Sequence, residues 1–520
     1  MCALFYVSII AFFATTPFVY RSTIVIMNLP AEIYSVDSVR KIDQIAINDE
    51  GIGGYTLMTR AGQAAASAMT ERFAAAKRWQ IICGSGNNGG DGYVVARIAA
   101  EQGIAVSVLA LSSPEELTGD AATAYMDFAA LGGAVAEYDG ALDADAELLV
   151  DGLLGSGLER PVEGKFADVV DAMNAHPAAV VALDIPSGLH GDTGAVLGTA
   201  VEAQLTVTFV GLKSGLFLDR GPELAGEIVF AGLEIPARCR AGEVAIMRRI
   251  DEAIVRKALP ARKRSSHKGK FGHVLIIGGG VGMPGAVHLC GEAALRAGAG
   301  LVSIATHSSH SALIPASRPE LMCHAVESAD DLAPLLERAT TIAIGPGLGT
   351  GDWAKALLAA VLDTRLPVVA DADALNLLAG SESNPEVLSD WILTPHPGEA
   401  ARLVGTSATE VQGDRPGTLA RIAEKFGGTV ILKGSGTLVS SKKGQPWLCS
   451  AGNPGMASPG MGDVLTGIVA AFRAQKLSAE LAAVVGVQVH ACAGDAAAEA
   501  GQRGLMASDL IKEIRNWVNP

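Results

Sequence analysis

Short apolar runs that end in glycine-rich turns and lead into helix-compatible stretches recur along this sequence. In the first such unit, the run Trp79–Cys83 is followed by the turn Gly84–Gly92 and a predicted helix over Tyr93–Ala100. The run His273–Ile277 opens a second unit, whose predicted helix covers Val287–Gly298. Parallel strands need helical crossovers in this order, and tight turns suit a chain with 61 glycines and only 5% aromatic residues. The sequence therefore predicts an α/β fold.

The length of 520 residues exceeds what one hydrophobic core usually fills, so two or three domains are expected. A charge-rich connector over Arg238–Arg264, interrupted by Pro260, separates two halves. We therefore expect one domain over residues 27–245 and another over residues 251–520. The connector is expected to be solvated, and His267–Gly272 is a candidate neighbour of phosphates.

The first 26 residues form an apolar extension. Cys2–Tyr20 is almost wholly apolar, which is typical of a signal peptide or a membrane anchor. However, the segment lacks a basic beginning and is interrupted at Thr15–Pro17. We therefore favour a gene start placed too early, with the true start at Met27, and we expect no association with a membrane.

The charge balance and the cysteines limit the classes of function. A net charge of −15 argues against general nucleic-acid binding, which requires a basic surface. An acidic chain can still bind phosphates, because backbone N–H groups at helix N-termini do so. The seven cysteines lie far apart without a Cys-x-x-Cys pair, so neither a disulfide framework nor a zinc site is expected. We expect a cytoplasmic protein, since that compartment is reducing.

Two glycine-rich turns stand close together in the C-terminal part of the sequence. Lys433–Thr437 and Gly460–Asp463 flank a hairpin-like segment over Leu438–Leu448, and a predicted helix over Val464–Ala471 follows. Glycines let backbone N–H groups approach an anion, and a helix start adds partial positive charge. In isolation, Asp463 is best interpreted as a helix cap. With the Lys433 turn nearby, a base that faces the phosphates of a nucleotide is favoured.

In the first half, acidic residues follow two further predicted strands. Asp151 ends the run Leu148–Val150, and Asp184 ends the run Val180–Leu183. Parallel sheets bind ligands at the carboxyl ends of their strands, so both carboxylates are expected beside the turn Gly84–Gly92. The alternative is that each aspartate merely caps a loop.

In the second half, five predicted strands end in polar or glycine-rich turns, and such repetition is hard to explain by packing alone. These turns begin at Gly278, Gly345, Asp371, Thr394 and Lys433. His396 lies between two prolines, which stiffen its backbone. A lone histidine is more often structural, but its place at a strand end favours a contact with substrate. Glu399 is expected to open the following helix.

Three motifs resemble those of the bifunctional NAD(P)H-hydrate repair enzymes: Asn-Asn-Gly-Gly-Asp at 87–91, Lys433–Thr437 and Gly460–Asp463. The resemblance extends from about Met27 to the end of the chain. That family joins an NAD(P)HX epimerase to an ADP-dependent (S)-NAD(P)HX dehydratase. The resemblance implies a Rossmann-like three-layer domain followed by a ribokinase-like α/β domain. It also implies epimerisation of NADHX and NADPHX, and dehydration of the S epimers to NADH and NADPH as ADP becomes AMP and phosphate.

The resemblance further implies roles for individual residues. K⁺ would be held in the epimerase half by oxygens of Asn88, Asp151 and Ser187, which suit a hard cation. Asp184 would be the acid or base there, and Asp463 the base of the dehydratase, where Mg²⁺ would neutralise phosphate oxygens. The nucleotide would contact Lys433, Gly434, Ser435, Gly436, Thr437 and Gly462. The hydrate would contact Asn87, Asn88, Gly89, Gly90, Asp91, Gly155, Ser156, Gly157, Leu158, Glu159, Arg160, Pro161 and Asp184 in the first half, and Ala286, Gly347, His396 and Asp463 in the second.

The implied dehydration is an elimination. The C6 hydroxyl of the hydrate is a poor leaving group, and transfer of a phosphoryl group from ADP would create a good one. Asp463 would deprotonate or orient the hydroxyl, while the turn Gly460–Gly462 would stabilise phosphate charge. Lys213 has no assigned role. A homo-oligomer is expected, because relatives of both halves commonly associate.

Two other classes of function compete with this one. A small-molecule kinase would use the same second half but leaves the first half unexplained. A non-catalytic sensor of pyridine nucleotides would bind the ligand and tolerate the loss of Asp463.

Overall fold

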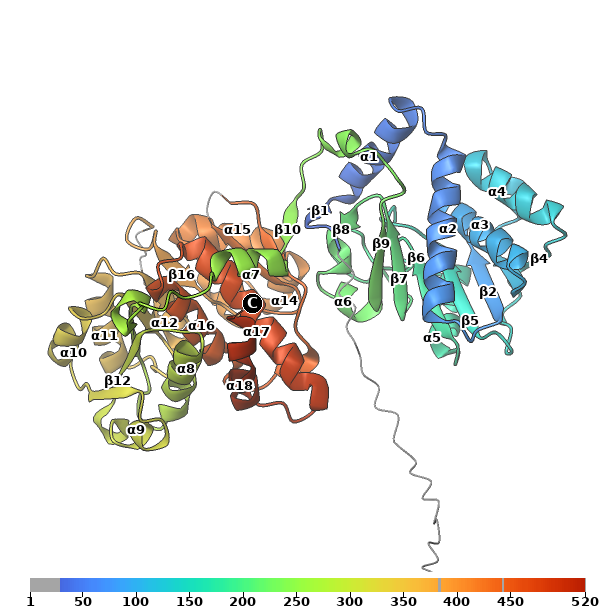
Figure 1. Cartoon of the computed structure of the whole chain (residues 1–520). Helices are drawn as coiled ribbons and strands as arrows, with labels where there is room; N and C mark the ends of the chain where they lie inside the picture. Colours follow the sequence, from blue (N-terminus) through green and yellow to red (C-terminus); the bar gives the residue numbers. More distant parts are fainter. Residues whose placement is uncertain (1–28, 382–384, 442–443, 520) are drawn as a thin grey trace, which may run out of the picture.

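The computed structural model describes residues 29–381, 385–441 and 444–519, so the interpretation of residues 1–26 lies outside the described part. Two sheets organise these residues (Figure 1). The first has seven strands, and all of its neighbouring pairs are parallel. In spatial order the strands are β4 (Val135–Glu137), β3 (Ala105–Ala110), β2 (Arg78–Cys83), β5 (Leu148–Gly152), β6 (Ala179–Leu183), β7 (Leu205–Phe209) and β9 (Glu227–Ala231).

Helices cover both faces of this first sheet. One core cluster holds side chains from α1 (Val36–Asn48), α2 (Gly54–Arg72), α3 (Asn87–Glu101) and α4 (Gly119–Ala130). The cluster on the other face includes Val169 and Met173 of α5 (Lys165–Ala175). The predicted three-layer α/β arrangement of the first half is therefore confirmed.

The second sheet has twelve strands among the described residues. Its parallel part follows the order β13 (Met322–Ala325), β12 (Leu301–Thr306), β11 (His273–Ile277), β14 (Thr341–Ile344), β15 (Val368–Ala370), β16 (Trp391–Leu393) and β17 (Thr429–Leu432). The remaining strands are β18 (Thr437–Ser441), β19 (Trp447–Cys449), β10 (Met247–Arg249), β1 (Glu32–Tyr34) and β8 (Leu212–Lys213). Strand β18 is antiparallel to both β17 and β19, and the β18–β19 pair confirms the predicted hairpin.

Helices cover both faces of the second sheet as well. The helices α8 (Pro284–Arg296), α16 (Met461–Ala474) and α17 (Ala479–Ala497) share one core cluster. The other face is covered by α11 (Asp352–Leu362), α12 (Ala372–Ala379), α13 (Pro397–Val404) and α15 (Arg415–Phe426). The stretch Ala479–Ala500 is long and apolar enough to cross a membrane, but 67% of its apolar window is buried inside the protein. It is therefore the core helix of this half.

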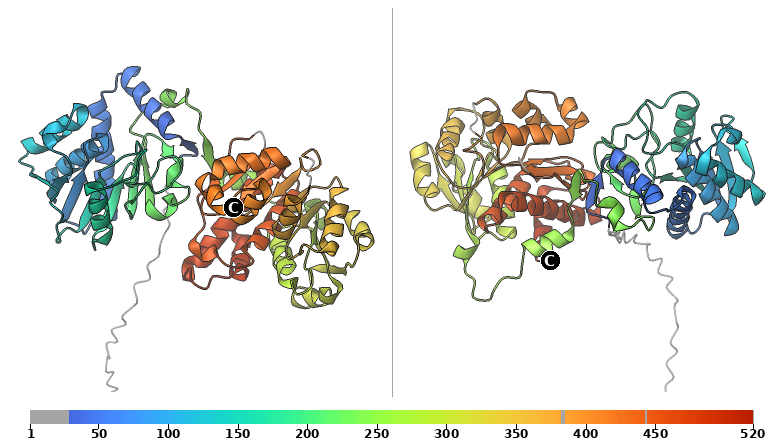
Figure 2. Two further views of the ribbon diagram at one scale, coloured as in Figure 1. Left: turned by 180° about the vertical axis from the view of Figure 1, so that it is seen from behind. Right: turned by 90° about the horizontal axis from the view of Figure 1, so that it is seen from above.

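The charge of the connector between the halves predicted that it is solvated, but part of it is buried. Strand β10 lies between β1 and β19 and so joins both halves in one sheet (Figure 2). Within β10, Arg249 is buried and donates to the carbonyls of Leu29 and Pro30, while Arg248 stacks over the ring of Trp447. Long arginine stems pack well against apolar surface, and this overrides their charge.

The segment His267–Gly272 is not a neighbour of phosphates. It precedes β11 and therefore lies at the amino edge of the sheet, where Gly272 packs against the carbonyl of Ala474 at the end of α16. Ligands of parallel sheets bind at the opposite edge.

Candidate active sites

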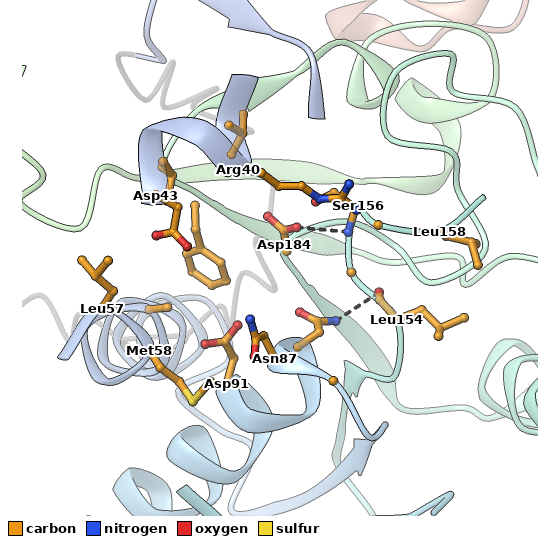
Figure 3. A pocket seen from close by; sticks show the side chains of 18 of the residues that line it. Arg40, Asp43, Leu57, Met58, Asn87, Asp91, Leu154, Ser156, Leu158 and Asp184 are labelled. Atoms are coloured by element: carbon orange, nitrogen blue, oxygen red, sulfur yellow. Dashed lines mark hydrogen bonds between the residues drawn. The ribbon is translucent and has the colours of Figure 1, made fainter. Parts of the chain in front are cut away.

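A cavity of about 860 Å³ lies at the carboxyl ends of β2, β5 and β6 (Figure 3). The carboxylates of Asp43, Asp91 and Asp184 all point into it, from α1, α3 and the end of β6. Most of the residues expected to contact the hydrate line this cavity: Asn87, Asn88, Asp91, Gly155, Ser156, Gly157, Leu158, Glu159, Arg160 and Asp184. Gly89, Gly90 and Pro161 do not line it.

Helix α3 begins at Asn87, six residues earlier than the sequence had suggested. A Cβ atom on Gly89 would lie 2.0 Å from the carbonyl oxygen of Gly84, and one on Gly90 would lie 2.6 Å from Cε of Met58. The two glycines therefore let α3 pack closely against β2 and α2. The prediction was wrong because two asparagines and two glycines have low helix propensity, which tertiary packing overrides here.

Asp184 forms a buried ion pair with Lys213, which the sequence left without a role. The Lys213 ammonium is 1% exposed, contacts the Asp184 carboxylate and donates to Thr208 Oγ1 at 3.1 Å and Phe209 O at 3.0 Å. Asp184 has a positive φ of 65° and accepts from the N–H of Ser156. Burial raises the pKa of Asp184, but Lys213 and Ser156 outweigh burial and hold the pKa below its ordinary value. Asp184 is therefore ionised.

Asp91 is the opposite case. Enclosure by the protein and the negative charges of Asp184 and Asp43 raise the pKa of Asp91 well above its ordinary value. Burial also raises the pKa of Asp43. Neighbouring carboxyl groups whose pKa values are pushed apart are the usual arrangement for an acid beside a base. Nothing in the sequence pointed to Asp43, because it looks like any polar residue of an amphipathic helix.

Asn88, Asp151 and Ser187, the expected potassium ligands, come together around Leu154. Asn88 Nδ2 donates to the carbonyl of Leu154 at 3.1 Å, and Ser187 Oγ donates to Asp151 Oδ1 at 2.6 Å and contacts the same carbonyl. Within the described residues, the buried oxygen Asn88 Oδ1 accepts no hydrogen bond. Asp151 is fully buried, and burial raises its pKa to about 6 although Ser187 and Leu153 donate to it. A cation would relieve both the orphaned amide oxygen and the buried carboxylate.

In the second half, the carboxyl ends of β14, β15, β16 and β17 lie side by side, as expected. Asp371, at the end of β15, joins three of the elements at this edge. It accepts from Lys433 Nζ at 2.7 Å, Thr394 Oγ1 at 2.7 Å and Thr466 Oγ1 at 2.9 Å. Burial raises the pKa of Asp371, but Lys433 and the two hydroxyls hold it below its ordinary value. This residue was noted in the sequence only as the start of a turn.

Asp463 lies in the first turn of α16, as predicted. The cap position is Gly460, in the left-handed region at φ 89°, and no side chain caps the helix. A Cβ atom on Gly462 would lie 3.3 Å from Lys433 Nζ, so the ammonium adjoins this turn. Burial and the charge of Asp371 raise the pKa of Asp463 to about 7, although Lys433 opposes them. This geometry favours a base over a helix cap.

His396 and Glu399 form the capping box of α13. His396 Nδ1 accepts from the N–H of Gly398, and Glu399 Oε2 accepts from the N–H of His396. Glu399 therefore opens the helix as expected, and it also lies 3.7 Å from Lys433 Nζ. The side chain of His396 is half exposed, so its contact with substrate stays a prediction.

Ala286 and Gly347 are neighbours at the same edge. A Cβ atom on Gly347 would lie 3.2 Å from Cβ of Ala286. Helix α8 begins at Pro284, three residues earlier than predicted. It packs directly against α16, because a Cβ atom on Gly467 of α16 would lie 2.1 Å from the carbonyl oxygen of Cys290 in α8. The structure thus gathers the expected hydrate contacts and Asp463 at one edge of the sheet.

Each half therefore places paired carboxylates and a lysine at the carboxyl edge of an α/β sheet, with the lysine side chain 1% exposed in the first half and 19% exposed in the second. This arrangement defines a two-site α/β enzyme. The family described as NAD(P)H-hydrate dehydratase matches residues 274–516, and the family described as YjeF-related protein N-terminus matches residues 54–215. A bifunctional NAD(P)H-hydrate repair enzyme of Coxiella burnetii is 47% identical over 489 residues, which cover 94% of this chain and 99% of that protein. Its counterpart in Escherichia coli is 42% identical over 495 residues, or 95% of each chain.

The chain therefore belongs to the family of bifunctional NAD(P)H-hydrate repair enzymes. The resemblance drawn from its motifs and the expectation of an epimerase joined to a dehydratase are confirmed.

Solved structures resemble the second half. A ribokinase-like superfamily protein of Enterococcus faecalis is 27% identical, with a TM-score of 0.49 over 53% of this chain and 96% of that one. An ADP/ATP-dependent NAD(P)H-hydrate dehydratase of Bacillus subtilis, co-crystallised with ATP and Mg²⁺, is 31% identical, with a TM-score of 0.48 over 51% and 96%.

Proposed function

We propose that residues 27–245 interconvert the R and S epimers of NADHX and NADPHX, and that residues 251–520 dehydrate the S epimers with ADP. The products are NADH or NADPH, AMP and phosphate. We further propose that the chain acts in the cytoplasm as a homo-oligomer. The observation that carries this proposal is the pair of strand edges at which Asp184 and Asp463 each adjoin a lysine. Pure protein mixed with both epimers and ADP should restore the absorbance of reduced nicotinamide, and a lack of recovery from either epimer would overturn it.

In the epimerase half, Asp91 and Asp184 supply the acid and the base. Protonated Asp91 gives its proton to the C6 hydroxyl, the C6–O bond breaks and water leaves, so that the ring nitrogen and C6 share a double bond. Water then adds to C6 from the opposite face, and the resulting proton passes to a carboxylate. Lys213 keeps Asp184 ionised and fixed in its left-handed backbone conformation. K⁺ would be held by Asn88, Asp151 and Ser187, and it would supply a fixed positive charge beside the substrate.

In the dehydratase half, Asp463 takes the proton of the C6 hydroxyl. The hydroxyl oxygen at the same time accepts the terminal phosphoryl group of ADP, and AMP leaves. Lys433 and the turn at Gly462 lie together and would bind the phosphates. Burial raises the pKa of Asp463 most, the carboxylates of Asp371, Asp373 and Glu399 raise it further, and the cation Lys433 opposes them. This excess of negative charge fits Mg²⁺, which Glu399 would hold together with phosphate oxygens and which would neutralise charge there. Phosphate then departs from C6, a proton leaves C5 to solvent, and the C5–C6 double bond that forms gives NAD(P)H.

The dehydratase should lose activity in acid, because Asp463 must be ionised to act as a base. Its pKa is about 7, so kcat/KM for NADHX at saturating ADP should fall about tenfold per pH unit below that value and level off above it. The epimerase rate of the same chain should not follow this profile, since it depends on protonated Asp91 and not on Asp463. A dehydratase profile that is flat through neutral pH would contradict the role of Asp463.

K⁺ should stabilise the first half more than Na⁺ does. If K⁺ binds only the folded protein, a hundredfold excess over its Kd would add about 2.7 kcal/mol to the free energy of unfolding. The Asp151→Asn variant should lose this dependence without unfolding, because it removes a buried charge that the protein does not pair. Thermal unfolding in matched KCl and NaCl measures the effect, with the exposed Asp145→Asn as control. Equal K⁺ dependence in Asp151→Asn and the unsubstituted protein would exclude this site.

A further inference from the structure

The two glycines of the turn Lys433–Thr437 are packed against protein on their inner side. A Cβ atom on Gly434 would lie 2.6 Å from Arg415 Nη1. Gly436, at φ 65°, would place its Cβ atom 2.1 Å from the carbonyl oxygen of Phe217, a residue of the first half. Glycine is therefore required at both positions whether or not a ligand is bound. The proposed nucleotide turn rests on groups from both halves of the chain.

Arg415 is a buried cation without a carboxylate partner. Its side chain is 2% exposed, and it forms no ion pair within 4.0 Å among the described residues. Burial lowers its pKa to about 10, although the charge of Asp219 in the first half opposes the shift. Such a group is costly to bury unless many acceptors surround it.

The acceptors of Arg415 are main-chain carbonyls of the nucleotide turn. Nη2 donates to the carbonyls of Leu432 at 3.3 Å and Gly436 at 3.2 Å, and Nη1 contacts that of Lys433 at 3.4 Å. Gln412 Oε1 accepts a further bond from Nη1 at 2.9 Å. A trans peptide holds its C=O and N–H on opposite sides, so fixing these carbonyls also fixes the direction of the N–H groups that follow them. Two of those groups are held in turn, since Lys433 N–H donates to Pro395 O at 2.9 Å and Gly434 N–H donates to Thr437 Oγ1 at 3.3 Å. Only the planar fork of arginine reaches acceptors spaced in this way.

Arg415 also lines a cavity of about 260 Å³ between the halves. Ser214 and Leu218 of the first half line it, as does Met247 of the connector strand β10. Leu218 is buried there, and its Cδ2 lies 3.8 Å from the Cβ position of Gly436. The first half thus packs against the turn at Gly436.

We propose that Arg415, together with Phe217 and Leu218 of the epimerase half, positions the turn Lys433–Thr437 for ADP. The epimerase half would then be part of what makes the dehydratase half competent to bind its nucleotide. This inference rests on the proposed function, because it takes Lys433–Thr437 as the nucleotide-binding turn.

The test is the Arg415→Lys variant of the full chain, with KM for ADP and kcat measured separately. We expect KM for ADP to rise about tenfold or more while kcat changes little, because hydrogen bonds from a charged donor to the turn are lost. The epimerase rate of the same chain should not change. The Leu218→Ala variant removes packing against the turn from the other half, so it should also raise KM for ADP, by less than Arg415→Lys does.

Arg249→Lys is the matched control. Arg249 is also a buried arginine that donates to main-chain carbonyls, but its partners are Leu29 and Pro30. This variant should unfold at a lower temperature with an unchanged KM for ADP. If Arg415→Lys and Leu218→Ala keep the original KM and the original affinity for ADP by calorimetry, the inference is wrong. If the unsubstituted chain lacks ADP-dependent dehydration altogether, the proposed function fails instead.

Discussion

Replacing Asp463 with asparagine should abolish ADP-dependent dehydration, with kcat lowered about a hundred- to ten-thousandfold, the range lost with a general base. Asparagine keeps the shape of the side chain but cannot accept the proton of the C6 hydroxyl. The carboxylate is also partly protonated at neutral pH because its pKa is about 7. Removal of its charge should therefore leave folding and ADP affinity nearly unchanged. Dehydration assays and ADP calorimetry on the purified variant measure both effects.

Asp509→Asn is the matched control for this substitution. Asp509 is the third residue of α18 (Ala507–Trp517), as Asp463 is the third residue of α16, and it accepts from the N–H of Met506. The amide oxygen can still accept from Met506, so the variant loses chiefly a negative charge near the helix N-terminus, which should cost about 0.3–1 kcal/mol of stability and spare both activities. A dehydratase that survives Asp463→Asn with its original kcat would remove Asp463 from the mechanism.

Replacing Lys213 with methionine should abolish epimerisation and also destabilise the first half. The variant leaves the Asp184 carboxylate without its ion-pair partner, and breaking a buried pair in this way costs about 3–5 kcal/mol. The pKa of Asp184 is held down chiefly by Lys213, so the variant should also shift its ionisation to higher pH. Epimerase rates and denaturant unfolding measure the two losses.

The double variant Lys213→Met with Asp184→Asn separates stability from catalysis. Without either charge the pair leaves no uncompensated ion, so the free energy of unfolding should return toward the original value. The epimerase should stay inactive, while the dehydratase half of the same chain should work normally. Recovery of epimerisation in the double variant would show that neither residue takes part in the reaction.

The sequence predicts the positions of strand ends well, because each short apolar run is closed by a residue that cannot continue it. Asp151, Asp184 and Lys433 all lie where their strands indicated, at the carboxyl edges of parallel sheets. The helix after the turn was also predicted, since the turn runs directly into an apolar stretch, although α16 begins at Met461 and not at Val464. Local patterns of this kind need no knowledge of distant contacts.

The partners of these residues could not be predicted in the same way. Lys213 and Asp371 matter through contacts with residues that are 29 and 62 positions away in the chain. Arg249 and the start of α3 were misjudged because burial overrides what charge and helix propensity indicate locally. Arg415, buried beneath the turn Lys433–Thr437, would look in any sequence like a surface arginine at the start of a helix.

The most direct test of two sites acting on one damaged coenzyme is a time course with an equal mixture of both NADHX epimers and ADP. The unsubstituted chain should convert all of the mixture to NADH at the rate of the dehydratase. The Asp184→Asn chain should convert half of it at that rate and the remainder only as fast as the epimers interconvert without an enzyme. A variant that converts the whole mixture in a single fast phase would contradict the assignment of epimerisation to the Asp184 site.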